Sequence, residues 1–325
     1  MQVRNENMAA GMGEGAGKFI EVVEVGTRDG FQIEAQFVPT ETKIALINEL
    51  IDAGVRRFEA TSFVSPRAVP QLADAEQVIA SVRRKPGVRL TALAANVKGA
   101  ERAVAAGVDA IVLFCSASET HNAKNVNRSV EESLAGFREI APIARRAGVE
   151  IVGAIATAFG CPFEGNVPVE SLLRVARAYA DVGAKEIGLG DTTGMATPPT
   201  VRAAIQALRS ELPQLDVGLH FHNTRGVGLA NVMVGLEEGI TRYDAAFAGL
   251  GGCPFAAGAT GNICTEDLVY LLHESGYETG IDLDKIIAVA RKVEKLFGRT
   301  LPGQVMKAGP RLTRHAADAV TAAAG

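Results

Sequence analysis

The chain has 325 residues, 47% of them hydrophobic, which is enough for two ordinary domains or for one large α/β barrel. Its formal net charge of −4 comes from 33 basic and 37 acidic residues scattered along the chain, so a nucleic-acid partner is not expected. The cysteines lack Cys-x-x-Cys spacing, and no apolar run is long enough to span a bilayer. These features predict a cytoplasmic protein with no membrane partner.

The first 17 residues carry no periodic apolar positions and are predicted to form a disordered leader. Their glycines suggest a phosphate-binding loop. However, no strand precedes Gly11, and Phe19 stands where such a loop needs Ser or Thr. No nucleotide site is therefore expected in this segment.

From Phe19 onward, short β-branched runs alternate with amphipathic helical stretches. The helical stretches have apolar residues at helical spacing and a glycine just before the next strand. This alternation predicts parallel strands joined by crossover helices. The predicted strands begin at Phe19, Val55, Val88, Val108, Val149, Ala184, Val217 and Arg242.

These β/α units fill the chain, whereas an open doubly wound sheet usually has fewer strands and an early glycine fingerprint. The sequence therefore predicts an α/β fold, namely a (β/α)8 TIM barrel with an additional C-terminal helix near 283–297. The predicted organisation is the leader over 1–17, the TIM-barrel catalytic domain with its C-terminal helix over 18–300, and a tail over 301–325.

Polar residues gather where the predicted strands end, and TIM barrels carry their active sites at that end. Five loops contribute them to one face. They are 26–30 after the first strand, Glu59 with Thr61 and Ser62 at the end of the second, 190–194 after the sixth, 220–223 at the end of the seventh, and 249–255 with Asn262 after the eighth.

The strongest local signal is the pair His220 and His222. Residues two apart on a strand project to the same side, so the two imidazoles can converge on one ion. The competing interpretation is a pair of interior histidines satisfied by hydrogen bonds. Asp29 is the carboxylate expected to complete the site, although an aspartate before Gly30 also suits a turn. If Asn262 adds a carbonyl oxygen, the ligand set favours Mg²⁺ or Mn²⁺.

Three further residues have two interpretations each. Arg28 is suited to hold a developing enolate or oxyanion, or it forms a salt bridge at the rim. Asp191, in a Gly-Asp-Thr-Thr-Gly turn, orients a base or caps the helix that begins near Thr197. Cys253 lies in a Gly-Gly-Cys-Pro loop of lid-like composition, and it is either catalytic or an inert thiol.

The chain shows no G-x-S-x-G elbow, no H-E-x-x-H helix and no P-loop, which removes the commonest hydrolase, metalloprotease and NTPase interpretations. Instead it resembles the hydroxymethylglutaryl-CoA lyase family, within the metal-dependent lyases and Claisen synthases that open with Arg-Asp-Gly on a TIM barrel. The resemblance runs from Val22 to about Asp284. Its motifs are VGTRDGFQIE, FEATSFVSPRAVPQLAD, NVNRSVEES, FGCPFEG, IGLGDTTG, HFHNTRGVGLAN and AGLGGCPFAAGATGNICTEDLVYLL.

The resemblance implies a homodimeric lyase that cleaves a 3-hydroxyacyl-CoA, 3-hydroxy-3-methylglutaryl-CoA in the first place, to acetyl-CoA and acetoacetate. By this resemblance, a divalent ion (Mg²⁺ or Mn²⁺) is bound by Asp29, His220, His222 and Asn262, and Glu59 supports these ligands. Arg28 stabilises the enolate, Asp191 takes part in proton transfer or positioning, and Cys253 acts from the closing loop. The substrate contacts are Gln32, Gly188 and Arg225.

Some positions depart from the family pattern. Gly188 stands where a serine contacts substrate, and Arg225 replaces a tyrosine and would recruit an extra anionic group. A related 3-hydroxyacyl-CoA therefore stays open as the substrate. Three different functions also stay open, namely those of a pyruvate-type metal-dependent aldolase, a Claisen synthase that runs the reaction in the condensing direction, and a catalytically silent acyl-CoA-binding protein.

Overall fold

The computed structural model describes residues 18–252 and 260–314. The predicted leader, Cys253 and the end of the predicted tail lie outside the described residues. Within the described part of the chain, no helix is long and apolar enough to cross a membrane. The division into leader, catalytic domain and tail stays a prediction.

Eight parallel strands close into a barrel in chain order, and β8 pairs with β1. Each of the eight predicted runs overlaps one of them, so the predicted TIM barrel is confirmed. The strands are β1 Glu21–Glu24, β2 Arg57–Ser62, β3 Arg89–Leu93, β4 Ala110–Ser116, β5 Glu150–Ala156, β6 Glu186–Asp191, β7 Asp216–Phe221 and β8 Arg242–Ala245.

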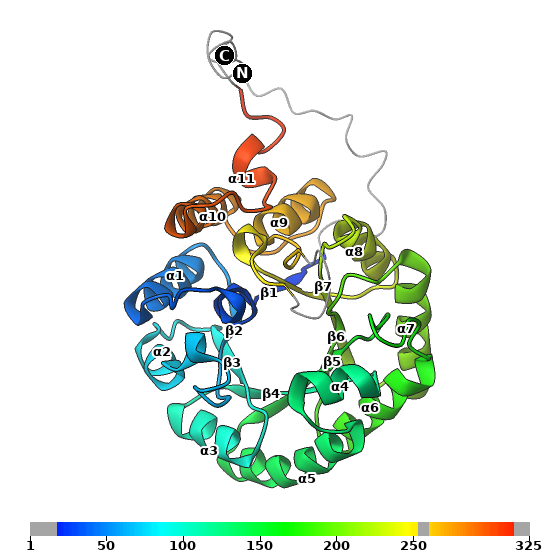
Figure 1. Ribbon diagram of the computed structural model, residues 1–325. Helices are drawn as coiled ribbons and strands as arrows, with labels where there is room; N and C mark the ends of the chain where they lie inside the picture. The colour runs from blue at the N-terminus through cyan, green and yellow to red at the C-terminus, as the bar shows by residue number, and fades with distance from the viewer. Residues whose placement is uncertain (1–17, 253–259, 315–325) are drawn as a thin grey trace.

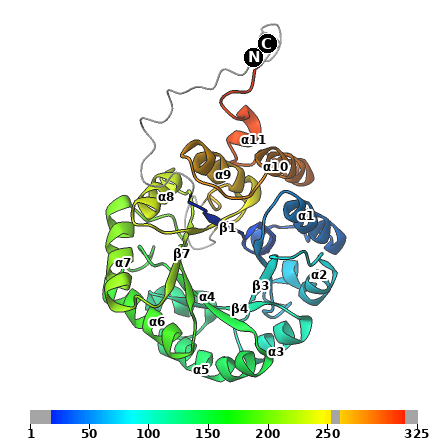
Figure 2. The ribbon, with the colours of Figure 1, turned by 180° about the vertical axis from the view of Figure 1, so that it is seen from behind.

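The helices form a ring around these strands, and α4 lies inside that ring (Figures 1 and 2). The helices are α1 Thr40–Asp52, α2 Ala75–Ser81, α3 Val97–Ala106, α4 Glu119–Val126, α5 Val130–Ala147, α6 Val169–Asp181, α7 Pro198–Glu211, α8 Gly228–Glu237, α9 Thr265–Glu274, α10 Leu283–Phe297 and α11 Val305–Ala308. Short helical turns are η2 Gly26–Gly30, η3 Phe31–Ile33, η4 Pro70–Leu72 and η5 Phe247–Gly249.

The predicted additional helix is α10. The side chain of Asp282 accepts a hydrogen bond from the Lys285 N–H at its start, and Gly298 ends it with a φ of 61°. Its apolar stripe, which includes Val289 and Val293, is buried against α1, α9 and η5. The helix therefore packs outside the barrel, next to the loops that leave β1 and β8.

The amino ends of the strands are joined inside the barrel by charge. Glu186 accepts hydrogen bonds from Arg57 at 2.5 Å, from Arg89 at 2.8 Å and from Arg242. Burial raises the pKa of Glu186, but the hydrogen bond from Arg57 and the charge of Arg242 outweigh it and lower the pKa to about 2. One carboxylate thus ties β6 to β2, β3 and β8 and fills the lower end of the barrel.

We expect Glu186→Gln to lower the free energy of unfolding by roughly 3–5 kcal/mol, because it removes the one carboxylate that three poorly exposed guanidinium groups share. The stabilisation from the Glu186 charge is present above pH 4.5, the ordinary pKa, and is lost as the pH falls through about 2. Denaturant unfolding near neutral pH measures the change. The control is Glu170→Gln, which removes an exposed ion pair with Arg177 and should change stability by less than about 1 kcal/mol. Equal losses in the two variants would contradict the prediction.

Candidate active site

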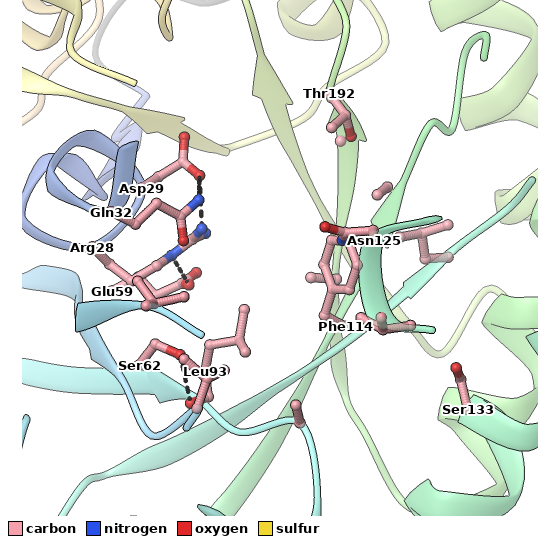
Figure 3. Close-up of a pocket in the computed structure, with 18 of the residues that line it drawn as sticks. Arg28, Asp29, Gln32, Glu59, Ser62, Leu93, Phe114, Asn125, Ser133 and Thr192 are labelled. Atoms are coloured by element: carbon pink, nitrogen blue, oxygen red, sulfur yellow. Dashed lines mark hydrogen bonds and ion pairs between the residues drawn. The ribbon is translucent and has the colours of Figure 1, made fainter. Parts of the chain in front are cut away.

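A cavity of about 520 Å³ opens at the carboxyl ends of the strands. The cluster Arg28, Asp29, Gln32 and Glu59 lies on one side of it, and Phe114 faces that cluster from the opposite side (Figure 3). His220, His222 and Asp244 also line it. The polar loops that the sequence placed at this end therefore meet around one space.

Asp29, His220 and His222 converge as predicted, and one ligand atom of each lies within 4.8 Å of the others. The Nε2 atoms of the two imidazoles face each other at 3.1 Å, and His222 Nε2 lies 3.7 Å from Asp29 Oδ2. Asn262 lies beside them: its Nδ2 donates to Asp29 at 2.8 Å, and its buried Oδ1 accepts no hydrogen bond. Its predicted role as a fourth ligand stays a prediction. Two imidazole nitrogens, a carboxylate and a free amide oxygen fit a divalent cation.

Local backbone structure brings these ligands together. Asp29 sits in the turn η2, where the N–H groups of Arg28 and Asp29 both donate to the carbonyl of Val25. His222 directly follows β7 and forms a bridge with Asn262. Because η2 follows β1, the neighbour of β8 in the closed barrel, the first and last loops of the barrel share one site.

Arg28 is held between two carboxylates. Its Nε pairs with Glu59, and its Nη1 donates to Asp29 Oδ1 at 2.7 Å. The Arg28 side chain is only 12% exposed, so the interpretation as a salt bridge at the rim does not describe it. Burial raises the pKa of Asp29, but the charges of Arg28 and His220 outweigh it and hold the pKa near 2. Asp29 is therefore ionised and ready to bind a cation at neutral pH.

Asp244 is a site residue that the sequence analysis missed. It is the register partner of His220 on the neighbouring strand, and its Oδ2 lies 3.1 Å from His220 Nδ1. A carboxylate in this position fixes the imidazole so that its other nitrogen faces the metal. The available signal was an acidic residue in the interior-facing alternation of the strand that begins at Arg242.

We expect Asp244→Asn to weaken divalent-metal affinity by about 10–100-fold, because the imidazole of His220 loses the charged group that orients it. Titration with Mn²⁺ followed by calorimetry measures this directly. Asp181→Asn, at an exposed position on α6, is the matched control and should bind metal normally. Unchanged affinity in Asp244→Asn would show that Asp244 does not position the ligand.

The other predicted site residues lie at different distances from this centre. Gln32 and Gly188 line the cavity, and Gln32 Nε2 donates to Asp29 at 3.1 Å. Arg225 is exposed and donates to the carbonyl groups of Thr193 and Gly194, and it is absent from the cavity wall. Its predicted recruitment of an anionic group stays a prediction, as does the predicted role of Cys253.

Asp191 serves the loop before α7. Its Oδ1 accepts hydrogen bonds from the N–H groups of Met195 at 2.6 Å and Ala196 at 2.8 Å. The helix itself is capped by Thr197, whose N–H donates to Thr200. Burial raises the pKa of Asp191 to about 7. These contacts order the loop before α7, and Asp191 is not the N-terminal cap of that helix. Its other interpretation, orienting a base, stays a prediction.

Two buried glutamates, also missed from the sequence, hold the loops of the site from behind. Glu24 accepts hydrogen bonds from Gly26 N–H at 2.7 Å, from Phe247 N–H at 3.1 Å and from the Thr265 hydroxyl at 2.7 Å. Glu266 accepts one from Ala248 N–H at 3.0 Å. Together they join η2, η5 and the start of α9. Burial raises the pKa of Glu24 to about 7 and that of Glu266 to about 8.

This burial makes stability depend on pH. For a carboxyl whose pKa is raised by folding, stabilisation is present below the ordinary pKa of 4.5 and is lost as the pH rises to the folded value, about 8 for Glu266. Glu266→Gln keeps an acceptor for Ala248 and removes the charge. We expect the melting temperature of Glu266→Gln, relative to that of the wild type, to increase as the pH rises from 4.5 to about 8. Glu131→Gln, at an exposed site on α5, should show no such trend. A constant difference for Glu266→Gln would contradict the assignment.

The fold and the site together define a TIM-barrel enzyme with a metal centre of two histidines and one carboxylate. The family model described as HMGL-like matches residues 19–293. The chain belongs to this family. The predicted family and the predicted lyase are therefore confirmed, as is dependence on a divalent metal. Asp29, His220 and His222 could hold that ion, and the assignment of the individual ligands stays a prediction.

The chain is similar to characterised lyases along most of its length. It is 44% identical to the mitochondrial hydroxymethylglutaryl-CoA lyase of Arabidopsis thaliana over 88% of this chain and 61% of that protein. It is 41% identical to the cytoplasmic 3-hydroxy-3-methylglutaryl-CoA lyase of Mus musculus, over 90% of this chain and 86% of that protein. A solved HMG-CoA lyase from Acinetobacter baumannii, in complex with coenzyme A and 3-methylmalate, has a TM-score of 0.88 and 45% identity, covering 92% of this chain and 97% of that one.

Proposed function

We propose that this chain cleaves the carbon–carbon bond between C2 and C3 of 3-hydroxy-3-methylglutaryl-CoA and releases acetyl-CoA and acetoacetate. The observation that carries the proposal is the convergence of Asp29, His220 and His222 with Arg28 around one cavity. The similarity to lyases with this named substrate supports it.

A divalent ion, which we propose to be Mg²⁺ or Mn²⁺, would be held by Asp29, His220, His222 and Asn262. When bound, it would supply Lewis-acid polarisation of the substrate's 3-hydroxyl, a contribution of several kcal/mol. The amide oxygen of Asn262 and the carboxylate of Asp29 are the hard ligands that favour these ions over softer metals. Asp244 keeps the imidazole of His220 aligned throughout.

Arg28 acts on the acetyl-CoA side of the bond that is cleaved. A base in the cavity takes the hydroxyl proton, and the C3–O bond becomes the ketone carbonyl of acetoacetate. The electron pair of the broken C2–C3 bond then moves onto the thioester oxygen of the acetyl-CoA enolate. The Arg28 guanidinium, fixed by Glu59 and Asp29, provides a permanently charged donor for that oxygen and needs no rearrangement. Protonation of C2 then completes acetyl-CoA, and we propose that Cys253 takes part in this step from its loop.

The two remaining polar residues have supporting roles in this proposal. We propose that Asp191 positions the loop 191–196 through its two backbone hydrogen bonds. Gln32 contacts both Asp29 and the cavity, so it would align the carboxylate and the substrate together. We further propose a homodimer in the cytoplasm.

Acetyl-CoA release from 3-hydroxy-3-methylglutaryl-CoA tests the function. We expect release by the chelated protein only after Mg²⁺ or Mn²⁺ is returned. Turnover in the presence of chelator would contradict the metal-dependent mechanism. Metal binding without any release would contradict the assigned substrate. The next substrates to test would then be other 3-hydroxyacyl-CoA thioesters and pyruvate-type aldol substrates.

Arg28→Gln provides the matched comparison. It should reduce kcat about 100-fold or more, because one charged donor to the enolate oxygen is lost, while Mn²⁺ affinity stays close to that of the wild type. Arg84→Gln, at an exposed position, should leave both unchanged. Loss of metal binding in Arg28→Gln would show that Arg28 organises the ligands and does not act on the substrate.

A further inference from the structure

The wall of the cavity opposite Arg28 contains a row of small residues next to Phe114. The register of the sheet aligns Phe114 of β4 with Ala154 of β5, Ala154 with Gly188 of β6, and Gly188 with Gly218 of β7. The next alignment toward the carboxyl ends pairs Gly190 with His220. The row that contains Gly188 therefore lies one level deeper in the barrel than the metal ligand His220.

The glycines of this wall differ in what surrounds them. A Cβ atom at Gly218 would lie 2.7 Å from the Arg242 side chain, so that space is already filled. One at Gly190 would lie 3.2 Å from the Ile155 carbonyl oxygen. One at Gly188 would meet no atom closer than the Gly153 carbonyl oxygen at 3.9 Å. Gly188 therefore leaves open space, and this space belongs to the cavity.

The surroundings of this space are apolar. Phe114, Ala154 and Gly188 all line the cavity, and none of them carries a polar side-chain atom. Arg242, which lies beneath Gly218, is committed to Glu186 and to the carbonyl groups of Ile187 and Asp216. The part of the wall formed by Phe114, Ala154 and Gly188 is therefore suited to contact a hydrocarbon group.

The geometry of the proposed reaction tells which part of the substrate would reach this space. The hydroxyl on C3 faces the metal ligands, and the thioester faces Arg28. Phe114 lies across the cavity from Arg28 and Asp29 (Figure 3). C3 also carries an alkyl branch and a carboxymethyl arm, and of these two the alkyl branch is the one whose chemistry suits the wall of Phe114, Ala154 and Gly188.

We propose that this chain favours 3-hydroxyacyl-CoA substrates in which C3 carries an alkyl branch longer than methyl, seated against Phe114, Ala154 and Gly188. This inference rests on the proposed function and refines its substrate class. Gly188 is the specificity-determining residue. It is also one of the positions at which the sequence departs from the family that it resembles.

The test compares 3-hydroxy-3-methylglutaryl-CoA with its 3-ethyl and 3-propyl homologues, using kcat/KM for acetyl-CoA release with Mg²⁺ present. Each added methylene that is buried is worth about 0.8 kcal/mol, so we expect kcat/KM to rise about 4-fold per methylene. A fall of about 10-fold per methylene, which is what a closed apolar pocket imposes, would overturn the proposal.

Gly188→Val fills the space and should reverse the preference. We expect kcat/KM for the propyl substrate to fall at least about 10-fold more than kcat/KM for the methyl substrate. Ala147→Val places the same valine side chain at an exposed position at the end of α5 and should leave the ratio of the two values unchanged. Equal losses on both substrates in Gly188→Val would overturn the proposal.

Inhibition by free coenzyme A tests whether the space beside Gly188 holds the alkyl branch or the thioester arm of the substrate. Gly188→Val should leave the inhibition constant of coenzyme A unchanged. If that constant rises as much as propyl turnover falls, the space holds the pantetheine arm and the proposal is wrong. Wild-type cleavage of the methyl substrate alone would overturn this inference and leave the proposed function standing, whereas cleavage of none of the three would overturn both.

Discussion

The ion pairs of Arg28 with Asp29 and Glu59 set the balance of charge in the site. A guanidinium this deeply buried is stable only beside opposite charge, and two carboxylates provide it from two different elements. Arg28 is only one of the partners of Asp29, since Gln32 also donates to Oδ1 and Asn262 donates to Oδ2. With Asp244 behind His220, negative charge exceeds positive charge at this point, and a divalent cation offsets the excess.

The two ends of the barrel use charge in opposite ways. At the amino end, Glu186 is shared by three arginines, and Glu21, Glu150 and Asp216 pair with the same arginines, so the charges of this layer are balanced. At the carboxyl end, the carboxylates outnumber Arg28, and His220 and His222 line the cavity. The layer at the amino end supports the site at the carboxyl end, because ligand geometry can be kept only on a scaffold that does not deform.

Much of the fold could be predicted from sequence because its signals are local. Alternating apolar runs and terminal glycines located every strand, and the period of two along a strand placed His220 and His222 on one side. Asp244, Glu24 and Glu266 were missed for the opposite reason. An isolated acidic residue in a sequence suggests a solvated surface. Only the closed register of β7 with β8 and of β1 with β8 places Asp244 and Glu24 at the site, and only the packing of α9 against η5 shows that Glu266 is buried.

The same limit applies to glycine. Gly188 and Gly218 are register partners on adjacent strands, and both lack a side chain. Arg242 nevertheless occupies the space beside Gly218, whereas the space beside Gly188 is open. The difference arises because Arg242, from a third strand, is drawn under Gly218 by Glu186. The charged layer at the amino end therefore helps to decide where the cavity above it is open, and so which substituent of a substrate it can accept.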